Sequence, residues 1–134
     1  MLITSFMAYS AWGLLALRLS LAATFFAHGK MKMGMWKMQP SQQMPSGMLN
    51  MMKFLSVAET LGAVGLLLGL LTQLAALGLG IVMLGAMYMK VFKWKSPFAS
   101  LEKNGWELDL VLLAGALMVF LAGPGMWAID LMMR

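Results

Sequence analysis

Residues 54–71 read FLSVAETLGAVGLLLGLL and residues 73–92 read QLAALGLGIVMLGAMYMKVF, and only Thr72 separates the two runs. Each run is almost wholly apolar, and about 20 such residues form a helix that crosses the roughly 30 Å hydrocarbon core of a bilayer. Inside a bilayer the backbone must satisfy its own hydrogen bonds, which favours helices over open sheets. The stretch therefore predicts two membrane-spanning helices joined by a tight turn.

Two further apolar runs, at about residues 9–29 and 106–127, have the same character. The composition agrees with a lipid environment, because 61% of the residues are hydrophobic and only 11% are charged, against about 25% charged in ordinary soluble domains. A soluble protein of 134 residues has too much surface to bury so many apolar side chains. We therefore predict one domain over residues 1–134, an all-α membrane protein folded as a four-helix transmembrane bundle.

The first apolar run is predicted to remain in the mature protein as a helix. A cleaved signal peptide begins with basic residues, whereas residues 1–17 contain none and Arg18 lies inside the hydrophobic stretch. Residues 9–29 are therefore counted as the first of four spans, and an even number of spans places both termini on the same side of the membrane.

The two long connections between the runs are rich in lysine. Residues 30–53 hold four lysines, two prolines and eight of the seventeen methionines, and residues 90–105 hold four more lysines. Such segments are typical of the membrane interface, where lysine reaches water while Met and Trp dip toward the lipid. The net charge of +5 is therefore assigned to the membrane surface, and we predict no nucleic-acid binding. The positive-inside rule makes both connections cytoplasmic and puts both termini outside, in a multi-pass protein of the cell (inner) membrane.

Five ionisable residues in the spans or at their ends form the candidate polar site. They are Arg18, His28, Glu59, Glu107 and Asp109. A charge at the centre of a bilayer costs about 2.5–3.5 kcal/mol on insertion scales, so such residues normally face the bundle interior and are paired. Glu107 and Asp109 are two residues apart and point to nearly opposite sides of a helix, so only one of them is expected to face Glu59.

The second run also carries a stripe of glycines, Gly62, Gly65 and Gly69, which is predicted to pack against another helix. Gly65 and Gly69 form a GxxxG pair, and small residues let two helix backbones approach closely. Glu59 shares a stripe with Gly62 and Gly69, which predicts that this acid lies in a helix interface and not in lipid.

The sequence leaves two interpretations of these charges open. In the first, Arg18 and one acid form a structural ion pair that fixes the register of the helices. In the second, Arg18, Glu59 and one acid of the fourth run line a polar site or a proton path.

No metal site is predicted. The chain has no cysteine and a single histidine, His28, which excludes an iron–sulfur cluster and a bis-histidine haem within one chain. Met31, Met33 and Met35 form an M-x-M-x-M run whose thioethers suit Cu(I), but methionine is also a common apolar filler at interfaces. We therefore expect the chain to hold no metal or redox cofactor of its own. Quinone is the candidate ligand of the predicted polar site.

The sequence resembles the DoxX family of small membrane proteins in four short elements that occur in order. They are Arg18-Leu-Ser-Leu with Phe26-Ala27-His28-Gly29 and Lys32, then Ala58-Glu59-Thr60-Leu61-Gly62 with Gly69-Leu70-Leu71-Thr72, then Gly105-Trp106-Glu107-Leu108-Asp109, and finally Gly123-Pro124-Gly125 with Ile129-Asp130. The resemblance implies a four-helix membrane bundle, often linked to quinone-dependent oxidoreductase systems that include thiosulfate:quinone oxidoreduction and quinol oxidases. The chain departs from the family pattern in its longer Met-rich connection, residues 31–52, and in Met126, where relatives often carry a basic residue.

The resemblance and the charges together predict an integral membrane subunit of a quinone-linked oxidoreductase complex, which provides an anchor and a quinone or proton site. One alternative is a non-catalytic scaffold or assembly subunit whose ion pair only holds the bundle. Another is a small-solute transporter, which a chain of this length would form only by oligomerising. The expected partners are the lipid bilayer, other membrane or peripheral protein subunits, and a second copy of the chain.

Overall fold

The computed structural model describes residues 6–102 and 104–134. The four long helices of this part are α2 (Ser10–Met33), α3 (Ser46–Leu68), α4 (Thr72–Tyr88) and α5 (Glu107–Ala122). Three short elements accompany them, namely the 3₁₀ turn η1 (Gly34–Lys37), the π-helical turn η2 (Met89–Lys93) and the terminal turn α6 (Ile129–Met132). The described residues contain no strand, so the predicted all-α class is confirmed.

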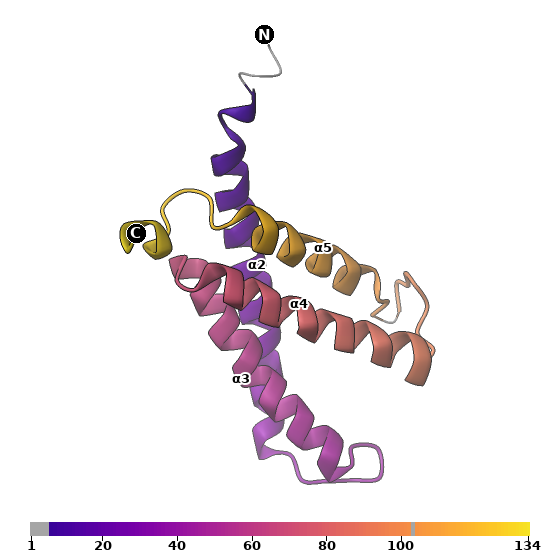
Figure 1. The fold of residues 1–134 in the computed structure, drawn as a ribbon. Coiled ribbons are helices and arrows are strands. Elements are labelled where there is room, and N and C mark those ends of the chain that lie inside the picture. Colours follow the sequence, from indigo (N-terminus) through magenta and orange to yellow (C-terminus); the bar gives the residue numbers. More distant parts are fainter. Residues whose placement is uncertain (1–5, 103) are drawn as a thin grey trace.

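The helices are arranged as two antiparallel hairpins (Figure 1). The helix α2 packs along α3, and α4 packs along α5, while α3 leads directly into α4 and α2 also touches α5. The N-terminal part of α2 projects beyond the other helices, and the chain after α5 turns back toward the α3–α4 turn (Figure 1). The two lysine-rich connections lie at the helix ends away from that turn.

Each long helix buries one narrow face and exposes apolar side chains elsewhere. The buried core consists of Leu21, Ala22, Phe25, Ala63, Leu66, Ala76, Leu79, Met83, Leu112 and Val119. Large apolar side chains such as Leu61 (67% exposed), Ile81 (60%) and Val111 (66%) face outward. In water so much exposed apolar surface would drive association, whereas lipid tails solvate it, so these faces are those of helices in a bilayer.

Three helices of the described chain are long and apolar enough to cross a membrane, namely Ser10–Lys37, Ser46–Leu68 and Thr72–Lys93. They correspond to the first three predicted spans. The helix α5 has 16 residues, or about 24 Å at 1.5 Å per residue, which is shorter than the bilayer core. It ends at Ala122 and not near residue 127, because Gly123 adopts φ 90° and Pro124 cannot donate a helical hydrogen bond. The crossing of the fourth helix stays a prediction.

The helices of the first hairpin extend further into the Met-rich connection than the sequence predicted. The helix α2 continues past residue 29 to Met33, and α3 begins at Ser46, directly after Pro45. Methionine and lysine are good helix formers, so the apolar runs alone underestimate where the helices end. The extension brings Lys32 into the last turn of α2, which decides the pairing described below.

The predicted packing glycines serve two different contacts. Gly62 and Gly65 face α4, and a Cβ added at Gly62 would lie 2.8 Å from the Leu79 side chain. Gly69 instead ends α3 in the left-handed region, at φ 65°, where glycine is the residue that meets no steric cost. Glu59 faces α2, as Gly69 does through its contact with Arg18, whereas Gly62 and Gly65 face α4. The acid therefore shares its interface with Gly69 and not with Gly62.

Candidate functional site

Glu59 lies between α2 and α3 with none of its side chain exposed. Lys32 donates a hydrogen bond from its ammonium group to Glu59 Oε1 and forms an ion pair with this acid. The Lys32 side chain keeps 21% of its surface exposed, so the pair connects the core to the surface at the lysine-rich end. The second carboxylate oxygen, Oε2, has no hydrogen-bond partner in residues 6–102 and 104–134.

The close contact of α2 and α3 at this level depends on Gly29. A Cβ at this position would lie 3.0 Å from the carbonyl oxygen of Ser56 and would also collide with the Thr60 hydroxyl. Trp36 Nε1 donates a hydrogen bond of 2.9 Å to Ser56 Oγ, which ties the turn after α2 to α3. Glycine therefore lets the two backbones approach closely beside the Lys32–Glu59 pair.

A second ion pair joins α5 to the end of α4. Lys90 Nζ lies 2.7 Å from Asp109 Oδ2 in an ion pair and donates a hydrogen bond of 3.3 Å to the carbonyl oxygen of Gly105. Asp109 is buried whereas Glu107 is exposed, so the two acids do point to different sides of α5. Asp109 is the acid that faces inward, and its partner is Lys90, which the sequence analysis did not consider.

Arg18 forms no ion pair with an acid among the described residues, so the interpretation that pairs Arg18 with one acid is wrong. Arg18 is 1% exposed and donates from Nη2 to the carbonyl oxygens of Met126 (3.2 Å) and Trp127 (2.9 Å). The cause is the antiparallel register of α2 and α3, which packs the guanidinium against Gly69. Gly69 lies roughly ten residues after Glu59, which is a rise of about 15 Å along the axis of α3. The polar site expected around Arg18 and Glu59 is therefore two separate sites.

Residues 123–130, here named the C-terminal strap, return from α5 over the α3–α4 turn. At its end Asp130 accepts hydrogen bonds from the backbone N–H groups of Leu71 (2.7 Å) and Thr72 (2.8 Å), and so caps the N-terminus of α4. Burial raises the pKa of Asp130, but the hydrogen bonds from Thr72 and Leu71 and the charge of Arg134 outweigh it and hold the pKa below its usual value. Arg18 and Asp130 together fasten the strap from two sides.

His28 joins no group of potential metal ligands among the described His, Asp and Glu residues. His28 is half-buried on α2, and Met31 and Met33 are 75% and 40% exposed. Among the described residues no three His, Asp or Glu side chains come close enough to hold a metal ion together. The candidate functional groups of the described chain are therefore the two acid–lysine pairs and the buried Arg18.

A family model described as DoxX matches residues 13–94, which is more than half of the chain. The chain belongs to the DoxX family. No curated protein and no solved structure shows a significant match to it. The DoxX match covers α2, α3 and α4, including Arg18, Lys32 and Glu59, whereas Asp109 and the C-terminal strap lie beyond it. Because DoxX is a membrane family and three helices are long and apolar enough to span, the protein is a membrane protein whose environment is a lipid bilayer.

Arg18 in this DoxX-family chain is expected to be needed for a stable C-terminal strap. In Arg18→Leu the carbonyl oxygens of Met126 and Trp127 lose their donor, and hydrogen bonds to a charged group are worth about 1.5–3 kcal/mol. Arg18→Lys should recover only part of the loss, because one ammonium cannot replace the planar guanidinium fork. Thermal unfolding in detergent measures the effect, with Lys30→Leu as a control, because Lys30 is an exposed cation of the same helix without an ion pair in the described chain. Equal stability of Arg18→Leu and Lys30→Leu would show that the strap does not depend on Arg18.

Proposed function

We propose that this DoxX-family protein is an integral membrane subunit of a quinone-linked oxidoreductase complex, in which the Lys32–Glu59 pair exchanges protons with the quinone. One observation carries the proposal. Glu59 is fully buried, with one carboxylate oxygen on Lys32 and the other without a hydrogen-bond partner among the described residues. A buried carboxylate oxygen without a hydrogen-bond partner is costly, and this free oxygen is the position at which Glu59 would take up a proton.

The chemistry of such a pair suits proton exchange. A carboxylate accepts a proton at its free oxygen and releases it again, while a neighbouring ammonium group stabilises the charged form. Lys32 is partly exposed at the lysine-rich end, which gives the buried acid a short route to water. A quinone takes up protons as well as electrons when it is reduced, so a buried acid near the membrane surface is a useful donor to it.

The electrons would come from elsewhere. The chain has no cysteine and one histidine, and thiolate and imidazole are the side chains that hold most protein redox centres. In this proposal the partner subunit therefore supplies the electron carrier, and the DoxX-family chain supplies the anchor and the proton site. The family resemblance supports a quinone-linked system only by analogy, since fold does not fix function.

A scaffold or assembly subunit is the second candidate, and a different observation favours it. Asp109 is paired with Lys90, and Arg18 is bound to backbone carbonyls of the C-terminal strap. Both groups hold one part of the chain against another, and a scaffold subunit requires only this structural role from its buried charges. The two candidates differ in the role of Glu59. In a scaffold subunit Glu59 would have a structural role alone, like Asp109 and Arg18.

Mild-detergent purification from native membranes tests the proposed complex. A tagged copy of the chain should co-purify with a redox-active protein and with quinone, measured by mass spectrometry and lipid extraction. A tagged unrelated membrane protein of similar expression level serves as the control. Recovery of partners without any redox protein or quinone would support the scaffold and contradict the proposal.

The orientation belongs to the same proposal, with both lysine-rich connections on the cytoplasmic side of a cell (inner) membrane and both termini outside. The chain has no cysteine, so single cysteines at Gln42, Ser100 and Ser5 can be labelled without background. Gln42 and Ser100 are exposed in the two connections, while Ser5, like Lys103 of the second connection, lies outside the described residues. A membrane-impermeant thiol reagent added to intact cells should label only the Ser5→Cys variant. Labelling of Gln42→Cys or Ser100→Cys instead would reverse the orientation.

A further inference from the structure

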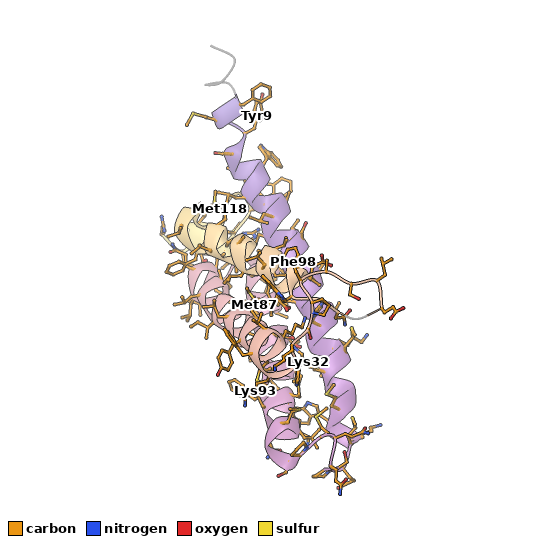
Figure 2. All side chains as sticks on the ribbon, turned by 90° about the vertical axis from the view of Figure 1, so that its right-hand side faces the viewer. Tyr9, Lys32, Met87, Lys93, Phe98 and Met118 are labelled. Atoms are coloured by element: carbon orange, nitrogen blue, oxygen red, sulfur yellow. The ribbon has the colours of Figure 1, made fainter. Side chains whose placement is uncertain are left out.

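A set of lysines in and beside the two long connections is not used by either ion pair. They are Lys30 in the last turns of α2, Lys37 in η1, Lys53 in α3, Lys93 in η2 and Lys95 in the connection that follows, here named the basic end. The salt bridges of the described chain involve only Lys32 and Lys90. Figure 2 shows Lys93 and Lys32 toward the same end of the molecule and Tyr9 at the opposite end. The basic end therefore carries positive charge without a partner in the described residues.

The acids nearby do not neutralise this charge. Glu59 and Asp109 are buried and already bound to Lys32 and Lys90, and no acid occurs between residues 19 and 58. Glu102 and Glu107 are exposed near the second connection, where they offset only part of the lysine charge. The first connection in particular presents lysines alone.

Exposed aromatic side chains alternate with these lysines. Trp36 is 52% exposed beside Lys37, while Phe92 (67%) and Trp94 (48%) flank Lys93. Lysine with tryptophan or phenylalanine on one surface is typical of the level of lipid headgroups, where the ring lies in the interface and the ammonium reaches the phosphates. Lys37 and Lys93 are the last residues of two of the helices that are long and apolar enough to cross a membrane, so lipid headgroups are the surface that these lysines and rings meet.

We propose that the basic end binds the phosphate headgroups of anionic phospholipids in preference to zwitterionic ones. The membrane-spanning helices place the lysines at headgroup level, and each lysine near an anionic membrane surface contributes to the attraction. The inference is independent of the quinone proposal, because it rests on the lysines without an ion pair and on the exposed aromatic rings, and not on Glu59. Binding should also hold the two connections in place, since both carry lysines of the set.

The test reconstitutes the full chain into nanodiscs of phosphatidylcholine alone or mixed with phosphatidylglycerol. Phosphatidylglycerol should raise the unfolding temperature by several degrees, and high salt should remove the gain because it screens the lysines. Protein re-extracted from mixed nanodiscs should retain phosphatidylglycerol several-fold over its bulk share. An unfolding temperature that is equal in the two lipids, in the wild-type chain at low salt, would overturn the proposal.

Variants assign the effect to the basic end. Lys37→Gln with Lys53→Gln should lose most of the phosphatidylglycerol enrichment, whereas Arg134→Gln, at the chain end away from the lysines, should keep it. Equal phosphatidylglycerol enrichment in the double lysine variant and in Arg134→Gln would contradict the assignment. Retention of an acidic protein in place of phosphatidylglycerol, when native membranes are extracted, would also contradict it, because the lysines would then serve a protein partner.

Discussion

Replacing Lys32 with leucine is expected to cause the largest loss of folded protein among single changes at the charged sites. The change leaves the Glu59 carboxylate fully buried and without its cation, and breaking a buried ion pair in this way typically costs about 3–5 kcal/mol. Glu59→Leu should cost less, because Lys32 is partly exposed and its ammonium group can turn toward water. The asymmetry follows from the unequal burial of the two partners.

The double variant Lys32→Leu with Glu59→Leu should be more stable than Lys32→Leu alone, since it removes both charges and leaves an apolar contact. The measurements are accumulation in the membrane and thermal unfolding in detergent. Lys30→Leu is the matched control, because Lys30 is exposed on the same helix and has no ion pair in the described chain. If Lys32→Leu behaves like Lys30→Leu, the buried pair does not stabilise the fold.

The sequence predicted the helices well because their signal is local. The runs at residues 9–29, 54–71 and 73–92 correspond to the three helices long and apolar enough to span a membrane, and about 20 apolar residues in a row have few other structures available. The ends were less accurate, since Met and Lys extended α2 to Met33 and the turn at Gly123 shortened α5. Helix propensity and turn residues fix such ends, and hydropathy does not record them.

The partners of the buried charges could not be predicted in the same way. Pairing depends on the register between helices, and the register comes from contacts such as Gly29 on Thr60 and Gly69 on Arg18. Lys32 lies outside the predicted first span, residues 9–29, so the apolar pattern does not indicate it as the partner of Glu59. The two-residue spacing of Glu107 and Asp109 did predict that only one would face inward, and the buried one is Asp109.

The C-terminal strap was also missed as a structural element, although its signals are present. Gly123-Pro124-Gly125 is a strong turn sequence, and Asp130 follows at a distance that lets it reach back to the α3–α4 turn. A cap supplied by a residue far along the chain is visible only when the fold is known, because capping patterns are normally read within one helix. The same holds for Arg18, whose acceptors are carbonyl groups and carry no sequence signature.

If the proposed quinone-linked role is correct, Glu59→Gln is expected to have the largest effect on quinone reduction. The amide keeps the volume of the side chain, and its oxygen can still accept the hydrogen bond from Lys32, although without the charge the bond is weaker. The variant should therefore reach the membrane and keep its partner proteins. Proton exchange should be lost, because an amide does not take up and release protons as a carboxylate does. Stability and proton exchange are thus separated by one substitution.

Quinone reduction by isolated membranes, divided by the amount of assembled complex, tests the proton site most directly. The comparison sets Glu59→Gln against Glu107→Gln, which removes the charge of an exposed acid with the same change of side chain. The proposed role of Glu59 predicts that Glu59→Gln loses most of the activity and that Glu107→Gln stays close to wild type. Full activity in both variants would contradict it and leave the buried pair with a structural role alone.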